Sequence, residues 1–544
     1  MPPPMDTESF LSTSYARIRA VACVPPGTSA RTLPPSSALT QARSSLPSSP
    51  SSIAAALLSG RGPEATLAHL ATDIAPALAG HNRSGRYYGF VTGSTLPVAE
   101  AADNLVSALD NSLQVHLPGQ SVATEVEDAA LRLLLSVLDL DVDGGGDEEG
   151  KGERWAGRTF TTGATASNVL GLACGREAVI AARLEAGSVD GGEGGGVGEL
   201  GLLGACAAAG VKEIQVLTSM GHSSLSKAAS IVGLGRRAVK ELRYSEGEPW
   251  RLDLDAVERE LQREGMASII AVSAGEVNTG RFATTGFEEM RRLRDLADKY
   301  KAWIHVDGAF GIFARSLPAT NEFARLREFT AGLELADSIT VDGHKLLNVP
   351  YDTGIFFTRT STIPQAVFQN PNAVYLSTPS TPSSGPTIPS PLNIGLENSR
   401  RFRALPVYAV LLSEGAAGIA DMLARMVRLA RGIAGAIARD EELRQDYELL
   451  PKQTQAQAQA GEEEENNTHI IVLFRARDEG LNEKLVEKIQ ASGEWYVSGT
   501  KWEGRPACRI AVSSWRVNVD EDLAFVKGKL AGIAKEWKEG RMVK

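Results

Sequence analysis

A lysine in an apolar setting is the most informative residue of this chain. Lys345 ends the tetrapeptide DGHK (342–345), which lies between a predicted strand at 338–341 and a second strand that begins at Gly354. A buried lysine has a lowered pKa, so its neutral amine can attack a carbonyl and form an imine (Schiff base). Taken alone, Lys345 also fits the description of a surface lysine that happens to follow a histidine.

An acidic side chain precedes this lysine at the end of another predicted strand. Asp307 follows the strand at 302–306, and Gly308 and Ala309 come directly after it. Ligands of parallel sheets bind at the carboxyl ends of strands. An ionised carboxylate there can keep a ring nitrogen protonated through a charged hydrogen bond, and small neighbours let a flat ring approach. The alternative role for Asp307 is to cap the following turn.

A small-residue loop opens the first predicted strand–helix unit. The segment TGAT (162–165), which contains Ala164 and Thr165, joins a strand at 158–161 to a helix at 166–185. Small residues and hydroxyl groups at a helix N-terminus can cradle a phosphate. An ordinary N-cap would have the same composition, so this loop is weak evidence by itself.

A histidine follows the next predicted strand. His222 lies in a strand-to-helix loop, where its ring could lie flat over an aromatic cofactor; taken alone, a core or surface histidine is the simpler interpretation. The order of the four features is more specific than any one of them. Phosphate loop, stacking ring, carboxylate and imine-forming lysine each fall at the expected end of a strand.

The elements that must position these residues alternate between strands and helices. This alternation predicts an α/β domain with a mostly parallel sheet. The predicted strands are 158–161, 213–218, 268–273, 302–306, 338–341 and 354–358, and the predicted helices are 166–185, 224–232, 253–263 and 287–300.

A second, smaller α+β domain is predicted after Pro391. Its elements are helices at 400–431, 482–492 and 520–537 and strands at 470–474, 495–498 and 508–512. The predicted division is an N-terminal arm (1–60), a helical segment (61–145), the large domain (146–390) and the small domain (391–544).

Polar low-complexity stretches interrupt this pattern. The arm is rich in Pro, Ser and Ala, and we expect it either to be flexible or to wrap a partner subunit, with simple disorder an equal alternative for 25–52. Gly-, acid- or Gln-rich stretches at 143–154, 187–198 and 452–467 are predicted surface insertions.

Composition excludes several classes of protein. The net charge of −10 over 544 residues argues against a nucleic-acid partner. We find no apolar run long enough to cross a bilayer and no signal peptide, so a cytoplasmic location is expected. The cysteines are far apart, which predicts neither a metal site nor disulfides and fits a reducing compartment. They are Cys23, Cys174, Cys206 and Cys508.

At these residues the sequence resembles the group II decarboxylases that depend on pyridoxal 5′-phosphate (PLP), such as the aromatic L-amino acid, histidine, tyrosine and glutamate decarboxylases. The resemblance extends from about Tyr87 to about Phe525. It implies PLP fold type I, the aspartate aminotransferase-like fold, and a homodimer. The segments that carry it are YYGFVTG (87–93), GEVNTG (275–280), HKLLNVPYDTG (344–354) and SRRFRAL (399–405).

The resemblance also implies a role for each candidate residue in binding the cofactor. The implied roles are an imine with PLP for Lys345, contact with the pyridine nitrogen for Asp307, stacking on the ring for His222, packing beneath it for Ala309, and phosphate binding for Ala164 and Thr165 with Asp342 and His344 nearby.

A tyrosine after the lysine is the candidate proton donor. Tyr375 resembles the tyrosine that many members carry on a mobile loop and that protonates the substrate Cα. Aldehyde-forming relatives often have Phe there, so Tyr375 favours simple decarboxylation. Leu346, Gly308 and Glu276 depart from residues common in the family and leave the substrate undetermined. The segment 508–516 matches only loosely, and no functional arginine is assigned to it.

The predicted reaction is therefore α-decarboxylation of an L-amino acid to its amine and CO2. Other PLP reactions on the same fold remain alternatives, namely aldehyde-forming oxidative deamination, C–S cleavage and transamination. Intact Asp307, Lys345 and Tyr375 argue against a catalytically silent homologue. A Rossmann dehydrogenase is disfavoured because no GxGxxG follows an early strand.

Overall fold

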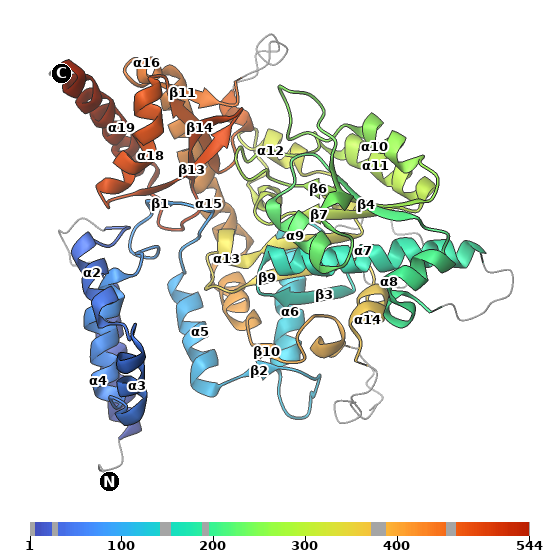
Figure 1. The fold of residues 1–544 in the computed structure, drawn as a ribbon, viewed down its shortest axis with the longest axis horizontal. Coiled ribbons are helices and arrows are strands. Elements are labelled where there is room, and N and C mark those ends of the chain that lie inside the picture. The colour runs from blue at the N-terminus through green and yellow to red at the C-terminus, as the bar shows by residue number, and fades with distance from the viewer. Residues whose placement is uncertain are drawn as a thin grey trace.

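The fold consists of a large domain, a small domain and an N-terminal helical segment (Figure 1). It is known from a computed structural model that describes residues 6–23, 31–141, 154–187, 195–370, 388–452 and 464–542. The predicted insertions lie largely outside these ranges, as do residues 24–30 of the arm.

A seven-stranded sheet with the order β3-β9-β8-β7-β6-β4-β5 forms the centre of the large domain. The pairs from β8 through β7, β6 and β4 to β5 are parallel, and β9 runs antiparallel to β8 and β3, which confirms the mostly parallel sheet. The strands are β3 (Gly157–Thr161), β4 (Glu213–Thr218), β5 (Val239–Glu241), β6 (Met266–Ser273), β7 (Trp303–Asp307), β8 (Ser338–Asp342) and β9 (Gly354–Thr358).

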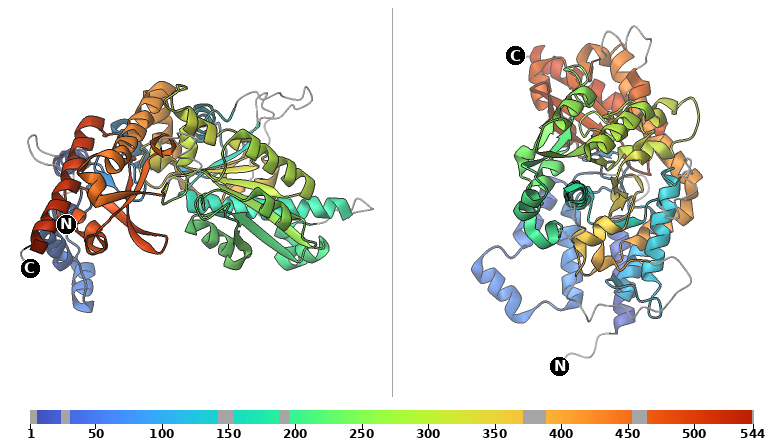
Figure 2. Two further views of the ribbon diagram at one scale, coloured as in Figure 1. Left: turned by 90° about the horizontal axis from the view of Figure 1, so that it is seen from above. Right: turned by 90° about the vertical axis from the view of Figure 1, so that its right-hand side faces the viewer.

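Helices cover both faces of this sheet (Figure 2). Alternate residues of β6 belong to different hydrophobic clusters: Ile269 and Ala271 face one, and Ile270 and Val272 face the other. A strand buried on both faces reads as a continuous β-branched run, which explains why the sequence signal was clear. The main helices are α7 (Ala164–Gly187), α9 (Ser223–Ile231), α10 (Leu254–Leu261) and α11 (Phe287–Tyr300), each within two residues of its predicted bounds.

The small domain contains a five-stranded sheet with the order β1-β13-β14-β12-β11. Its edge strand β1 (Tyr87–Tyr88) comes from the N-terminal part of the chain and pairs in parallel with β13. This strand was not predicted, because only its distant partner gives it a strand conformation. The remaining elements are β11 (Tyr447–Leu450), β12 (Ile471–Ala476), β13 (Tyr496–Trp502), β14 (Arg505–Ala511), α18 (Glu479–Ala491) and α19 (Val519–Met542).

One long helix joins the domains. Helix α15 (Ala404–Arg439) bends at Gly415, where φ is 59°, and packs against α5 (Pro97–Leu109), α6 (Ala123–Val137) and α19. By length and composition it meets the criteria for a membrane span, so the expectation that no apolar run is long enough is wrong. Its buried side chains, among them Ile419, belong to the main hydrophobic core.

The N-terminal segment is helical within the residues described. Helices α2, α3 and α4 project from the body beside α5 (Figure 1). Their sequences have good helix formers, and Ser49 forms a capping box with Ser52 at the start of α3. Disorder, the alternative considered for 25–52, does not describe residues 36–45. The helices are α1 (Thr7–Ala22), α2 (Ser36–Ser45), α3 (Pro50–Ser59) and α4 (Pro63–His69).

A fully buried histidine lies where the two domains meet. His469 stacks on Phe310, with ring centroids 6.3 Å apart, and lies 6.1 Å from Phe282. Neither ring nitrogen has a hydrogen-bond partner among the described residues. Burial, assisted by the charge of Arg431, lowers the pKa of His469 to about 3.

This histidine is expected to make stability depend on pH. In the unfolded chain the His469 ring takes up a proton with an ordinary pKa near 6.5, while in the folded chain it does so only at about pH 3. The free energy of unfolding therefore decreases as the pH falls through this window. Between pH 7 and pH 5 the wild type should lose about 2 kcal/mol more unfolding free energy than His469→Leu, measured by urea denaturation. Phe282→Leu, which perturbs the same cluster without a titratable group, should keep the wild-type slope. Equal slopes for wild type and His469→Leu would contradict this account.

Candidate active site

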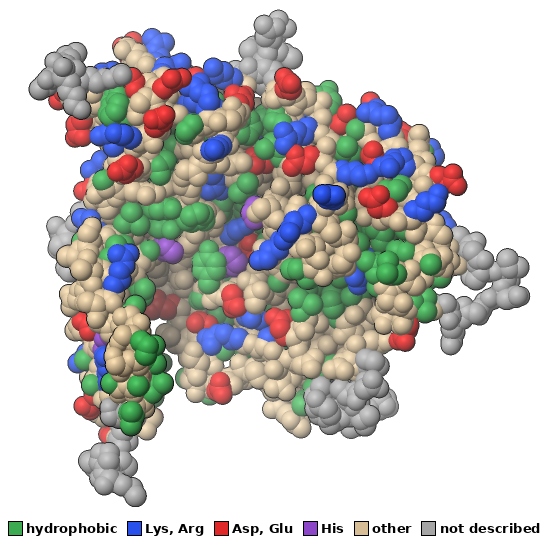
Figure 3. Space-filling view, in the orientation of Figure 1, with side chains coloured by type: hydrophobic (Ala, Val, Ile, Leu, Met, Phe, Trp, Pro, Cys, Tyr) green, Lys and Arg blue, Asp and Glu red, His purple; other side chains and the backbone are tan. Residues whose placement is uncertain are grey.

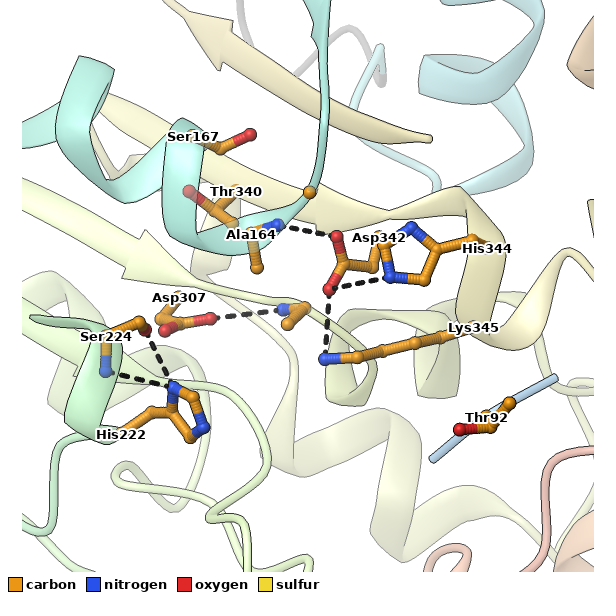
Figure 4. Close-up of polar contacts among 12 residues, drawn as sticks. Thr92, Ala164, Ser167, His222, Ser224, Asp307, Thr340, Asp342, His344 and Lys345 are labelled. Atoms are coloured by element: carbon orange, nitrogen blue, oxygen red, sulfur yellow. Dashed lines mark hydrogen bonds and ion pairs between the residues drawn. The ribbon is translucent and has the colours of Figure 1, made fainter. Parts of the chain in front are cut away.

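Lys345 forms an ion pair with a buried carboxylate at the carboxyl edge of the large sheet (Figure 4). Its Nζ lies 2.9 Å from Oδ2 of Asp342, whose side chain is 2% exposed. The other oxygen, Oδ1, accepts a hydrogen bond of 2.6 Å from the backbone N–H of Ala164, at the start of α7. Lys345 lies on a helical turn, α13 (Gly343–Leu346), where the sequence predicted a simple turn between strands. The carboxylate therefore links the lysine to the proposed phosphate loop.

His344 is held beside the same carboxylate as a neutral ring. Its Nδ1 accepts a hydrogen bond from the backbone N–H of Thr353, so the ring proton must be on Nε2, which lies 3.8 Å from Oδ2 of Asp342. The ring of Tyr351 stacks on it at 4.2 Å. Burial lowers the pKa of His344 more than Asp342 raises it.

Asp307 ends strand β7 and has two hydrogen-bond donors. Its Oδ2 accepts from the side-chain amide of Asn168 at 2.9 Å, and its Oδ1 accepts from the backbone N–H of Ala309 at 3.3 Å. These bonds fix the direction of the carboxylate. Asn168 lies on α7 and was not among the predicted site residues, because an asparagine inside a helix gives no signal of its partners.

His222 caps helix α9 and faces the same region. Its Nδ1 accepts the backbone N–H of Ser224 at 3.2 Å, so the proton is on Nε2, which has no partner among the described residues. Burial lowers the pKa of His222, while the charges of Asp307 and Asp342 raise it and that of Lys345 lowers it further. The ring is therefore near all three charged groups that the sequence analysis selected.

Asn348 connects three distant parts of the chain at the lysine turn. Its side-chain NH2 donates to the carbonyls of Lys345, Leu346 and Ser513, and its Oδ1 accepts from the backbone N–H groups of Ser94 and Trp515. It is fully buried, and its φ of 54° suits an asparagine. The motif at 344–354 contained this residue, but only the fold shows that it fixes the backbone of the lysine turn.

Close packing brings the N-terminal loop against the same turn. A Cβ at Gly93 would lie 2.2 Å from the carbonyl oxygen of Lys345, so only glycine fits there. The YYGFVTG segment thus approaches the lysine.

The turn GEVNTG (275–280) joins this edge to the small domain. Both carboxylate oxygens of Glu276 accept hydrogen bonds within the turn, from Asn278 and Thr279. The side chain that departs from the family pattern therefore serves to shape the turn. Asn278 accepts a hydrogen bond of 2.7 Å from Thr500, which lies in β13.

Arg509 in β14 is a further charged residue that sequence reasoning did not assign. Its Nε donates to the carbonyl of Val277 at 2.5 Å, its side chain is nearly fully buried, and Nη2 has no hydrogen-bond partner among the described residues. Burial lowers the pKa of Arg509 to about 10, against the opposing charge of Glu276. A buried guanidinium with a free nitrogen can bind an anion.

The arrangement fits a flat, phosphorylated aldehyde. It offers an amine at Lys345, a carboxylate at Asp307 and a neutral ring at His222, which extend into one region (Figure 4), together with the N-terminus of the long helix α7. A Cβ at Gly163 would lie 3.2 Å from the ring of His344 and would narrow this space. Thr165 lies on the first turn of α7. Tyr375 lies outside the described residues, so its proposed role stays a prediction.

The chain is similar to a known protein family, to curated proteins and to solved structures. The pyridoxal-dependent decarboxylase conserved domain matches residues 207–450. The L-2,4-diaminobutyrate decarboxylase of Acinetobacter baumannii is 28% identical over 400 residues, 71% of this chain and 69% of that protein. The phenylacetaldehyde synthase of Petunia hybrida is 26% identical over 298 residues, about half of each chain (54% and 55%). The structure of Oryza sativa TDC with PLP and tryptamine shares the fold, with a TM-score of 0.72 at 18% identity over 99% of both chains.

Proposed function

We propose that the chain, whose residues 207–450 match the pyridoxal-dependent decarboxylase conserved domain, is a group II decarboxylase with PLP as its cofactor and PLP fold type I, and that it converts one L-amino acid to the corresponding amine and CO2. The observation that carries the proposal is the convergence of Lys345, Asp307 and His222 at one edge of the sheet (Figure 4). In this proposal Lys345 is the residue that would hold the cofactor, through its Nζ amine.

The bound cofactor supplies an electron sink for the pair left on Cα when CO2 departs. Asp307 would hold the ring nitrogen in its protonated form, and the bonds from Asn168 and Ala309 hold that carboxylate in place. Asp342 lies within hydrogen-bond distance of Nζ and can take the proton that Lys345 must lose before its amine attacks a carbonyl. The neutral ring of His222 offers a flat face and an Nε2–H donor.

Two groups are proposed to act on the substrate. Arg509 can bind a carboxylate of the substrate through its unpaired Nη2, since a buried cation with an unpaired nitrogen favours an anion. Tyr375 is proposed to protonate Cα after CO2 leaves. Aldehyde formation is the alternative outcome, and the likeness to a phenylacetaldehyde synthase keeps it under test.

An amino-acid panel tests the reaction. Protein supplied with PLP should release CO2 and amine in equal amounts from one substrate among diaminobutyrate, glutamate, histidine and the aromatic amino acids. Lys345→Ala should lower the rate about 10³-fold or more and remove the borohydride-trapped cofactor from the peptide that contains position 345. Lys299→Ala, an exposed lysine, is the matched control and should retain both properties. A trapped cofactor on another lysine, or no CO2 from any amino acid, would refute the assignment.

Tyr375→Phe tests the choice between amine and aldehyde. Without the hydroxyl, the electron pair on Cα is exposed to dioxygen, so the aldehyde share of the products should rise about tenfold or more. Aldehyde, ammonia and amine are measured side by side under air and under nitrogen. An unchanged amine yield in air would remove Tyr375 from the proposed mechanism.

We propose that the N-terminal segment packs on a second copy of the chain, in a homodimer of the kind that the family resemblance implied. Leu57 and Leu58 on α3 are 81% and 86% exposed, and Ile53 on the same helix is exposed as well. Hydrophobic side chains gather on the surface of these helices (Figure 3). An apolar surface of this kind favours association. Sedimentation equilibrium should give twice the mass of the 544-residue chain, and a monomer at micromolar concentration would contradict the proposal.

A further inference from the structure

A chain of buried hydrogen bonds connects the interior of the large sheet to both sides of the proposed ring site. Its members come from two strands and two helices. They are Trp303 and His305 in β7, Ser338 and Thr340 in β8, Asn168 in α7, and Ser224 in α9.

The charge of Asp307 fixes the orientation of the central amide. A carboxylate only accepts hydrogen bonds, so the NH2 of Asn168 must face Oδ2 of Asp307, at 2.9 Å. The amide oxygen then faces the opposite way, where it lies 3.0 Å from Nε2 of His305 and 3.0 Å from the hydroxyl of Thr340. Asn168 is fully buried, so water does not replace these partners.

The amide oxygen in turn fixes the proton of His305. Because Oδ1 of Asn168 can only accept, the proton of His305 is on Nε2. Burial lowers the pKa of His305 to about 4, so the ring is neutral and its Nδ1 accepts from the hydroxyl of Ser338 at 2.8 Å. That hydroxyl accepts from the indole N–H of Trp303 at 2.9 Å, which leaves its hydrogen free to point at His305.

The second hydrogen of the same NH2 group reaches His222. Nδ2 of Asn168 donates to the hydroxyl of Ser224 at 3.1 Å, and this hydroxyl lies 2.7 Å from Nδ1 of His222. Since Ser224 already accepts from Asn168, its own hydrogen can point to His222. The side chain and the backbone N–H of Ser224 thus both donate to Nδ1 of His222, which places the ring proton on Nε2.

We propose that Asn168 is a positioning residue that sets the protons on both sides of the cofactor ring. One amide group holds the carboxylate of Asp307 on one side and, through Ser224, the tautomer of His222 on the other. This inference takes its chemical meaning from the proposed function, but proton positions can be measured without turnover.

Asparagine is the side chain that fits this position. The arrangement needs two donors on one side and an acceptor for two donors on the other, which asparagine provides in one planar group. Aspartate would place a second carboxylate against Asp307, and leucine of similar size would leave the N–H of His305 and the hydroxyl of Thr340 without their acceptor. The charged groups that act on His222 itself are Asp307, Asp342, Lys345 and Glu276.

Nitrogen NMR of the PLP-loaded full chain tests the proton positions directly. The chain has seven histidines, so [¹⁵N]histidine labelling gives few signals, and His222→Gln and His305→Gln assign two of them. At neutral pH both rings should show a protonated Nε2 and a bare Nδ1. A proton on Nδ1 of either ring, or a doubly protonated ring, would overturn the proposal.

Two variants test the link through the amide. In Asn168→Leu the signals of both His222 and His305 should change, and kcat on the amino acid that the panel selects should fall about 10- to 100-fold with a smaller change in KM. Ser167→Ala is the matched control. Ser167 lies on α7, as Asn168 does, and its buried hydroxyl donates to the carbonyl of Ile355 in β9, outside this chain of bonds. Its removal should leave the signals of both rings unchanged. An Asn168→Leu protein with wild-type ring signals would overturn the proposal.

Ser224→Ala tests the branch through His222 separately from the branch through His305. It also keeps the proposal testable if Asn168→Leu fails to fold, because it leaves the buried amide in place. The Nδ1 signal of His222 should shift, while the signals of His305 stay at their wild-type positions. Movement of His305, or no movement of His222, would contradict the proposed direction of the bonds. Absence of decarboxylation together with the expected ring signals would refute the proposed function and leave the proton assignment intact.

Discussion

The buried carboxylate of Asp342 is the contact on which the site depends. A charge with 2% of its side chain exposed is costly unless partners compensate it, and here the partners are the amine of Lys345 and the first N–H of α7. The helix terminus adds a favourable partial charge. Asp342 ends β8, and its two partners belong to α13 and α7. This one compensated charge therefore sets the position of Lys345 relative to the N-terminus of α7, which is suited to a phosphate.

Three neutral histidines lie near the charged groups of this sheet edge. Burial lowers the pKa values of His222, His305 and His344, and each ring has a defined acceptor nitrogen. The formal charges near the sheet edge are therefore carried by Asp307, Asp342 and Lys345, while the rings supply direction and shape. Such a division suits a reaction in which a proton and an electron pair must move along defined routes, since fixed dipoles need no reorganisation during the chemical step.

Hydrogen bonds to backbone and side-chain groups join the two domains beside this edge. Asn348 joins the lysine turn to the N-terminal loop and to the end of β14, and the turn at 275–280 contacts β13 and β14 through Asn278 and Val277. Arg509 is held against the turn at 275–280 by these contacts. A change in the packing of the small domain would therefore shift the backbone of the turn that carries Lys345.

The sequence by itself determined the order and type of the central elements, because strands buried on both faces give continuous apolar runs and the ends of parallel strands must share an edge. This reasoning placed Lys345, Asp307 and His222 together. The tertiary structure alone decided the contacts of Asn168, Asn348, Ser338 and Arg509, the joining of β1 to a sheet at the other end of the chain, and the length of α15. Each of these depends on a partner far away in the sequence, and no local pattern of residue types specifies such a partner.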